Sequence, residues 1–371
     1  MLDPISRAYM TKLSKLTCKR RNLRALVAGL ASWLCVFSFA CDYGAYPPKH
    51  TFPNVKVRFV NERTGWIVGP RVLRTQDGGN SWKLIRTDGP GTIVTETVDN
   101  EQRRIHFVDD RVGFLVTWER QIYKTVDGGE TWTQTNSPTV TDEWERLHTI
   151  FFITSTRGWV LGNNVYRTED GADTWSRVGP TPIGDDTRTE KPAVAEGYPP
   201  AVSFLNERTI VLARKDGDVH RSEDGGAKWR RVWSVNNFLR CVYFLNDKAG
   251  WIAGENGFMG RTTDGGASWE QIKTPTSGPL TSVFFLNDKK GWAVGHNGVI
   301  IYTTDGGTSW LNAQVKVDGF KTYLADICFV DEKRGWAVGD EPFNDLDFSS
   351  QPSNLILESH DGGQTWVPLN L

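Results

Sequence analysis

The sequence has few of the residues from which covalent or metal-based frameworks are built. Its 371 residues include five cysteines and six histidines, and neither type is clustered. Five cysteines are too few for a disulfide framework, so Cys241 and Cys328 are predicted to be buried thiols. The scattered histidines and cysteines favour neither a metal site nor any other cofactor site. The most apolar run, Ala25 to Ala40, has 16 residues, which is shorter than a comfortable membrane span.

The chain also lacks an excess of charge of either sign. Its net charge is −1, but residues 1–40 hold seven of the 43 basic side chains and one of the 44 acidic ones. The rest of the chain therefore has a net charge of −7. A mildly acidic body argues against non-specific binding of nucleic acid, which depends on positive charge. The apolar content of 39% excludes a disordered chain.

Residues 1–40 have the order of features found in a secretory signal. A basic stretch precedes the apolar run, and Ser38-Phe39-Ala40 fits a small-x-small cleavage site. We therefore predict a signal peptide over residues 1–40, a linker over 41–51 and one folded domain over 52–371. Lipoprotein and twin-arginine types of signal both remain open.

Cys41 would be the first residue after cleavage and is a candidate lipidation site. Ala40 fits a lipobox, whereas Ser38 and Phe39 depart from it. The alternative is an ordinary thiol in a linker. The protein is expected to be exported in either case.

One phrase recurs along the rest of the chain: a hydroxyl residue, any residue, Asp-Gly-Gly, any residue, Ser or Thr, and Trp. Its aspartates are Asp77, Asp127, Asp170, Asp224, Asp264, Asp305 and Asp361. The mean step between them is about 47 residues. Two copies deviate, since Ala172 replaces the second glycine and Lys228 replaces the Ser or Thr.

A second phrase precedes most copies of the first. A phenylalanine column with an aliphatic residue two positions earlier marks one strand in every unit, as in Val57 and Phe59. Gly-Trp, small apolar residues and Gly follow in five units, whereas Phe114 stands there in the second and the phrase is lost in the fourth. Each unit thus has four short strands. Seven such units predict an all-β fold, a seven-bladed β-propeller of four-stranded antiparallel blades.

The tryptophans are expected to pack between neighbouring blades, with each indole N–H paired. Within the Asp-Gly-Gly phrase, the glycines permit positive φ in a tight turn, while the aspartate accepts backbone N–H groups. A residue that recurs in every blade is more simply architectural than catalytic. We therefore assign the seven aspartates to turn structure, in the turn between strands 3 and 4 of each blade.

The repeated phrase resembles the Asp-box (BNR-type) propeller repeat. Together with the Gly-Trp phrase, as in Gly65-Trp66-Ile-Val-Gly69, it is similar to the photosystem II assembly and stability factor family. The resemblance covers about residues 52–371. It implies a non-enzymatic propeller of the thylakoid lumen or periplasm that binds a membrane-complex subunit during assembly. Lipidation at Cys41 would give a lipid-anchored protein, peripheral membrane association is the other form expected, and we expect a monomer.

The resemblance includes an arginine-rich patch for the protein partner. The positions that match it stand just before the box hydroxyl in five consecutive blades: Arg74, Lys124, Arg167, Arg221 and Arg261. We call these five residues the basic column. The alternative is a set of cations that pair with local acids.

Two other readings remain open. Long segments at 86–103, 133–148, 176–200, 311–322 and 340–353 are expected on the face opposite the boxes, where loops on a rigid scaffold commonly bind partners. Because sialidases and some glycosidases share the box, the alternative function is a glycan-binding or glycoside-hydrolase propeller.

Overall fold

The computed structural model describes residues 55–69, 72–85, 104–117, 120–140, 145–183, 200–317, 322–340 and 354–369. The predicted leader, Cys41 and the linker lie outside these ranges. The described residues all belong to one compact unit, Thr51–Leu371. Within the described ranges, no helix has the length and apolarity needed to cross a bilayer.

The first four blades are contiguous in sequence. Blade 1 contains β1 (Lys56–Phe59), β2 (Gly65–Val68), β3 (Val72–Thr75) and β4 (Lys83–Ile85). Blade 2 contains β5 (Arg104–Phe107), β6 (Gly113–Val116), β7 (Ile122–Thr125) and β8 (Thr133–Thr135). Blade 3 contains β9 (Thr149–Phe152), β10 (Gly158–Leu161), β11 (Asn164–Thr168) and β12 (Ser176–Pro180). Blade 4 contains β13 (Ala201–Phe204), β14 (Ile210–Ala213), β15 (Asp218–Ser222) and β16 (Arg230–Ser234).

The last three blades include two short 3-10 helices. Blade 5 contains β17 (Leu239–Phe244), β18 (Gly250–Gly254), η1 (Glu255–Gly257), β19 (Met259–Thr262) and β20 (Glu270–Ile272). Blade 6 contains β21 (Leu280–Phe285), β22 (Gly291–Gly295), η2 (His296–Gly298), β23 (Ile300–Thr303) and β24 (Leu311–Asn312). Blade 7 contains β26 (Leu324–Phe329), β27 (Gly335–Asp340), β28 (Asn354–Ser359) and β29 (Thr365–Pro368).

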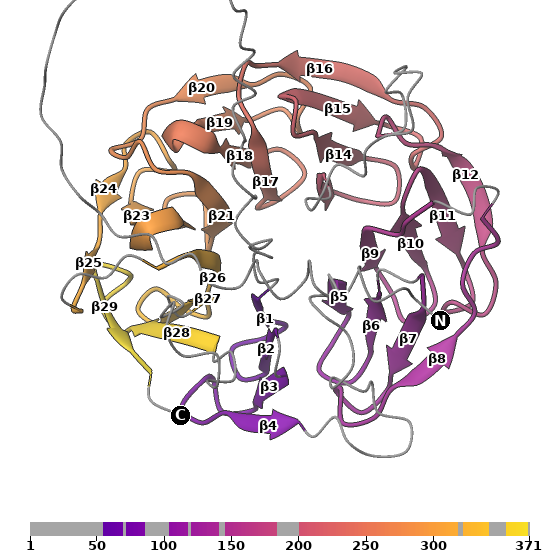
Figure 1. Cartoon of the computed structure of the whole chain (residues 1–371), viewed down its shortest axis with the longest axis horizontal. Helices are drawn as coiled ribbons and strands as arrows, with labels where there is room; N and C mark the ends of the chain where they lie inside the picture. The colour runs from indigo at the N-terminus through magenta and orange to yellow at the C-terminus, as the bar shows by residue number, and fades with distance from the viewer. Residues whose placement is uncertain are drawn as a thin grey trace, which may run out of the picture. The chain divides into compact units, whose positions relative to one another are not determined.

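The strands form seven sheets, and in each sheet the consecutive strands of a blade pair antiparallel. The sheets surround a central axis, with β1, β5, β9 and β17 toward the centre and β4, β8, β12 and β16 at the rim (Figure 1). The seven-bladed all-β propeller predicted from the sequence is thereby confirmed. The short strand β25 (Gln314–Val315) adds a feature that the repeats did not predict, since it pairs parallel with β29 and extends blade 7 to five strands.

Aromatic rings join each blade to the next. In blades 1, 5, 6 and 7 the Gly-Trp tryptophan stacks on the column phenylalanine of the following blade, with ring centroids 3.7 Å apart for Trp66 and Phe107. The same phenylalanine meets the box tryptophan of its own blade edge-on, as Phe107 meets Trp132. The glycine before the Gly-Trp tryptophan is needed for this packing, because a Cβ on Gly65 would lie 2.6 Å from the Phe59 ring. The repeated phrases therefore encode the contacts between blades.

The expectation that each indole N–H is paired was wrong for about half of the repeat tryptophans. Five donate to a backbone carbonyl: Trp66, Trp132, Trp175, Trp292 and Trp366. Seven have a buried indole nitrogen without an acceptor among the described residues: Trp82, Trp159, Trp229, Trp251, Trp269, Trp310 and Trp336. Burial of the large apolar ring body outweighs the loss of one hydrogen bond at these positions.

A buried carboxylate lies where blade 7 meets blade 1. Asp326 on β26 is fully buried and accepts hydrogen bonds from the Val57 N–H (3.1 Å) and the Arg58 guanidinium (3.0 Å) of β1. It also accepts from the Ser282 hydroxyl of β21 (2.6 Å), in blade 6. Burial alone would raise the pKa of Asp326, but Arg58, Lys56 and the hydrogen bonds from Ser282 and Val57 together hold that pKa below its ordinary value. One ionised side chain thus links three blades at the point of ring closure.

Three of the long segments expected to be loops contain strands. Residues 133–135, 176–180 and 311–315 hold β8, β12, β24 and β25, because the outer strand of each blade begins directly after the box. Residues 86–103, 141–144, 184–199, 318–321 and 341–353 lie outside the described ranges.

Candidate functional site

Every box aspartate lies in the turn between strands 3 and 4 of its blade and is used inside that turn. In blade 1, the Thr75 hydroxyl donates to Asp77 Oδ1 (2.8 Å) and accepts from the Gly79 N–H (2.8 Å). The Ser81 N–H donates to Asp77 Oδ1 (3.0 Å) and its hydroxyl to Oδ2 (2.5 Å). Equivalent bonds hold Asp127, Asp170, Asp224, Asp264, Asp305 and Asp361. The box carboxylates therefore stabilise their own turns.

These hydrogen bonds stabilise the ionised form of the carboxylates. The Ser81 hydroxyl and N–H lower the pKa of Asp77 to about 2, and the Thr174 hydroxyl and N–H do the same for Asp170. At Asp224, Lys228 replaces the hydroxyl residue, and only its backbone N–H reaches the carboxylate. The blade 4 turn therefore has one hydrogen bond fewer.

The box turns share one face of the ring with the turns between strands 1 and 2. In each blade, the N–H of the first box glycine donates to a backbone carbonyl of the strand 1–2 turn. Gly78 donates to Arg63 (2.8 Å), and Gly225 donates to Arg208 (2.8 Å). We call this side of the ring the box face. The connection between blades 5 and 6 lies on the other side, where the Thr274 hydroxyl donates to the Gly257 carbonyl of the strand 2–3 turn (2.6 Å).

The basic column occupies the end of strand 3 in blades 1 to 5, next to the box face. Each member sits opposite the Gly-Trp position of strand 2, as Arg74 pairs in register with Trp66 and Arg167 with Trp159. The five side chains do not converge on one pocket. Each instead approaches the box turn or the strand 1–2 turn of the following blade.

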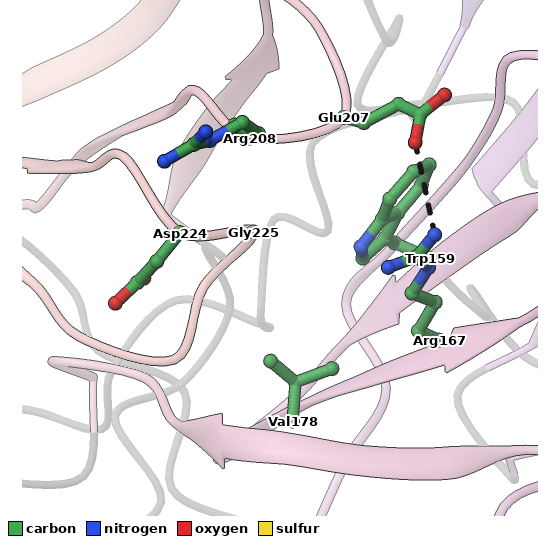
Figure 2. A pocket seen from close by; sticks show the side chains of 7 residues that line it. All are labelled: Trp159, Arg167, Val178, Glu207, Arg208, Asp224 and Gly225. Atoms are coloured by element: carbon green, nitrogen blue, oxygen red, sulfur yellow. Dashed lines mark ion pairs between the residues drawn. The ribbon is translucent and has the colours of Figure 1, made fainter.

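Arg167 lies in a group of charges between blades 3 and 4. Its guanidinium pairs with Glu169 of its own blade and lies 3.7 Å from Glu207 of blade 4, while its Cζ lies 5.3 Å from the centre of the Trp159 ring (Figure 2). Arg157 also pairs with both glutamates. Arg167 keeps 38% of its side chain exposed, which makes it accessible from solvent.

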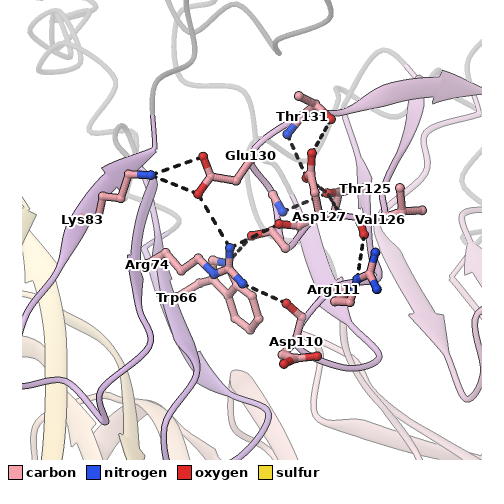
Figure 3. A network of polar contacts seen from close by, with 12 residues as sticks. Trp66, Arg74, Lys83, Asp110, Arg111, Thr125, Val126, Asp127, Glu130 and Thr131 are labelled. Carbon is pink, nitrogen blue, oxygen red and sulfur yellow. Dashed lines mark hydrogen bonds and ion pairs between the residues drawn. The ribbon is translucent and has the colours of Figure 1, made fainter.

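Almost all of the Arg74 side chain is buried in contacts within the protein. Its side chain is 9% exposed, and its guanidinium donates to the carbonyl oxygens of Asp127 (3.2 Å) and Asp110 (3.1 Å) in blade 2. It also lies 3.7 Å from Glu130 and stacks over Trp66 (Figure 3). Arg74 therefore fastens blade 1 to blade 2.

The other three members of the basic column are intermediate between Arg74 and Arg167 in exposure to solvent. Arg221 is 12% exposed, donates to the Gly265 carbonyl of blade 5 (2.9 Å) and pairs with Glu223. The Lys124 ammonium lies 5.5 Å from the centre of the Phe114 ring. Arg261 is half-buried, and its Nε has no acceptor among the described residues.

The sequence did not single out the strand 1–2 turns, which surround the column. Their signal is an Asn or Asp, or Thr154 in blade 3, whose side chain accepts the N–H groups two and three residues later, as Asn206 does from Arg208 and Thr209 (both 2.9 Å). These turns supply Asp110 and Glu207, the groups that meet the column. Near the column lie two hollows: about 310 Å³ between blades 3 and 4, and about 390 Å³ beside Lys124 and Asn136. Among the described residues, no cluster of His, Cys, Asp and Glu could hold a metal ion.

Comparison with known proteins relates the chain to one family. The model of the family described as "Photosynthesis system II assembly factor YCF48" matches residues 89–236 and 231–320. The Photosystem II assembly lipoprotein Ycf48 of Prochlorococcus marinus is 34% identical over 145 residues, which is 39% of this chain and 40% of that protein. The match thus spans less than half the length of this curated relative.

Two solved structures share the fold. One, described as YCF48 bound to D1 peptide, is 19% identical with a TM-score of 0.61 and covers 84% of this chain and 94% of that one. The other, YCF48 from Cyanidioschyzon merolae, is 18% identical with a TM-score of 0.60 and covers 78% and 94%. Because the family model matches well over half of the sequence, the chain belongs to the photosynthesis system II assembly factor YCF48 family.

Proposed function

We propose that this protein is an exported, non-enzymatic propeller that binds a subunit of a membrane complex and assists its assembly. The observation that carries the proposal is membership of a family of photosystem II assembly factors. A relative whose title reports a bound D1 peptide supports a protein segment as the ligand. On this proposal the partner is a photosystem II subunit, and the protein acts as a monomer.

The box face is the proposed binding surface. The basic column places a cation on five consecutive blades beside this face, on a body whose overall charge is acidic. Such a local concentration of positive charge would steer an acidic partner and raise its association rate. Because Arg74 and Arg221 already bond to the next blade, Lys124, Arg167 and Arg261 are the members left to meet a partner.

The internal use of the carboxylates supports a role without catalysis. A glycosidase needs two carboxyl groups free to act on the sugar, whereas the box aspartates accept hydrogen bonds within their own turns. We therefore keep the boxes as architecture and assign the protein no reaction.

Export and anchoring complete the proposal. The signal features of residues 1–40 and the lipoprotein named among the relatives support export, with a lipid anchor at Cys41. The compartment would be the thylakoid lumen or periplasm. Replacement of Cys41 by Ala should then move the protein from the membrane fraction to the soluble fraction, whereas a protein that is soluble already refutes the anchor.

Affinity capture tests the function. The tagged full-length protein is purified from gently solubilised membranes of its host, and co-purifying proteins are identified by mass spectrometry. We expect a membrane-complex subunit, with recovery that falls as salt rises.

The matched variants carry the same change of charge on opposite faces. Lys124→Glu with Arg261→Glu should reduce recovery of the subunit several-fold. Lys273→Glu with Lys316→Glu, at exposed positions of the blade-to-blade connections, should not. Equal recovery with both pairs, or capture of no membrane protein by the native chain, would overturn the proposal.

A further inference from the structure

The outer edge of blade 2 is formed by β8, the strand Thr133–Thr135. It is the last strand of its sheet, and within the described ranges no further strand pairs with it. Figure 1 shows β8 at the rim of the ring. Thr133 and Gln134 are exposed, and the strand has no charged residue. An open edge of this kind presents backbone N–H and C=O groups that can pair with another chain.

The other outer strands that the structure describes are protected from such pairing. Charges, bulges, shortness and covering segments are the usual means of protection. Four strands carry charged side chains: Lys83 on β4, Arg177 on β12, Arg230 and Arg231 on β16, and Glu270 on β20. Of the other two, β24 has two residues and β29 is covered by β25. In the described part of the chain, β8 therefore stands apart as an uncharged and uncovered edge, and its register with β7 is unbroken.

Blade 7 shows how an outer edge of this propeller takes a further strand. There β25 runs parallel to β29 and supplies a fifth strand from the connection that precedes the blade. The N–H groups of Gln314 and Lys316 donate to the carbonyls of Gln364 (2.8 Å) and Trp366 (2.9 Å). The contact is thus made by backbone groups, with a segment outside the four strands of the blade.

The geometry of blade 7 also shows which backbone groups of β8 point outward. Leu369 and Thr135 each stand three residues after the box tryptophan of their blade. The Leu369 N–H donates inward, to the Ile356 carbonyl of β28 (2.9 Å), and Thr135 pairs in the same register with β7. Because adjacent residues of an edge strand direct their backbone groups to opposite sides, the N–H and C=O of Gln134 point outward.

A hollow of about 390 Å³ lies beside this edge. Thr133, Gln134 and Thr135 line it, together with Asp173 of the blade 3 box turn. The Asn136 amide donates to the Asp173 carbonyl (2.8 Å), which holds the end of β8 against blade 3. Hydroxyl and amide groups predominate in the lining, so the hollow suits uncharged side chains of moderate size, such as Thr and Val.

We propose that the outer edge of β8 binds an extended, uncharged segment of the protein partner as a fifth strand of blade 2. Backbone hydrogen bonds supply the affinity in this mode, and the hollow selects among side chains. The contact needs no carboxylate on the segment, which distinguishes it from the steering of an acidic partner by the basic column. The inference rests on the proposed function, because the segment belongs to the partner.

Two observations favour a segment of the partner over a second copy of this chain. The box residue Thr131 lines the same hollow, so a partner held at the box face would present a tethered segment to β8 at high effective concentration. A strand of three residues is also too short to provide the roughly 1,000 Å² that a stable interface between two copies needs.

Backbone amide resonances of the protein labelled with ¹⁵N-glutamine test the site. The probe is the peptide Ac-Thr-Val-Thr-Val-Thr-amide, and its counterpart with every amide N-methylated keeps the side chains but cannot donate. Gln271, exposed at the same position of β20 but next to Glu270, is the internal control. We expect the Gln134 amide to shift with the first peptide and not with the second, and the Gln271 amide to stay unchanged. Each resonance is assigned by its loss in the corresponding proline variant.

Variants identify the backbone group that binds, with fluorescence anisotropy of the labelled peptide as the measurement. Gln134→Pro removes the outward N–H and leaves the pairing with β7 intact, and Pro368 already stands at this position of β29. It should weaken peptide binding about fivefold, whereas Gln271→Pro should not. Thr133→Glu copies Glu270 of β20 and should also weaken binding, which gives a second variant if the first does not fold.

Three results would refute the site. They are equal shifts at Gln134 and Gln271, equal shifts with the two peptides, or no shift with either. A shift of the Gln134 amide with protein concentration alone, absent in Thr133→Glu, would assign the edge to a second copy and would also contradict the inference.

The outcome is independent of the capture experiment. A protein that captures its membrane partner but shows no peptide response at Gln134 leaves the proposed function intact and refutes this site. A response at Gln134 without capture of any membrane protein supports the site and refutes the proposed function.

Discussion

Replacing Asp326 by Asn should loosen the ring where blade 7 meets blade 1. The substitution keeps the size of the side chain but removes the charge that pairs with Arg58 and neighbours Lys56. It also replaces one acceptor oxygen with a donor nitrogen. The amide oxygen can still accept from the Val57 N–H, but the amide nitrogen then faces the Ser282 oxygen, and the Ser282 hydroxyl hydrogen loses its acceptor.

The magnitude follows from the exposure of each partner. Loss of one member of a fully buried ion pair costs about 3–5 kcal/mol. The Arg58 side chain is 52% exposed, so water replaces part of the lost interaction, and the ionic contribution falls toward the roughly 1 kcal/mol typical of exposed pairs. One unsatisfied buried donor adds about 1–3 kcal/mol. We expect the free energy of unfolding to fall by about 2–4 kcal/mol.

Urea unfolding followed by circular dichroism measures the change, and hydrogen exchange locates it. Amides of β1 and β26 should lose protection, while those of blades 3 and 4 keep it. Asp288→Asn, the same substitution at an exposed position of blade 6, is the control. If the two variants differ by less than about 0.5 kcal/mol, Asp326 does not hold the ring closed.

Three further changes test the boxes and the contacts between blades. Asp264→Ala should lower the free energy of unfolding by about 1–3 kcal/mol, since the turn amides lose their acceptor, and an unchanged urea midpoint would show the box to be dispensable. The Trp310 ring is 5% exposed and packs edge-on to Phe285, so Trp310→Ala should lower the free energy of unfolding by about 3–5 kcal/mol. Trp269 is only half-buried, so Trp269→Ala should lower it less. Equal losses for the two variants would show that burial of the box tryptophan does not set its contribution. The pKa of Asp77 is lowered to about 2, as it is in several other boxes, so ionisation favours the folded state. The melting temperature should therefore hold above about pH 4 and fall as pH drops toward about 2, and a flat profile there would refute the assignment.

The features that recur in every blade could be predicted from the sequence. Seven copies of one turn phrase, each preceded by a phenylalanine column, allow one geometry to be inferred from many examples. The four strands per blade, the inner position of β1 and its counterparts, and the place of each box follow from that repetition. A single copy would have left the turn phrase ambiguous.

The features that differ from blade to blade could not be read in this way. Arg74 and Arg167 occupy the same repeat position, yet Arg74 donates to two carbonyl oxygens of blade 2, whereas Arg167 meets the carboxylates of Glu169 and Glu207 beside a cavity. Asp326 occurs once, and its partners on β1 lie more than 260 residues away. Such contacts depend on how the ring closes rather than on any local pattern.

Crosslinking from the two faces of the propeller shows which face meets the partner. A photoreactive amino acid is placed at Val126, a box-turn side chain that is 55% exposed, or at Ser277 in the exposed connection between β20 and β21. After irradiation of living host cells, we expect a covalent adduct between the Val126 position and a membrane-complex subunit, and none from Ser277. An adduct from Ser277 alone would place the partner on the opposite face and contradict binding at the box face.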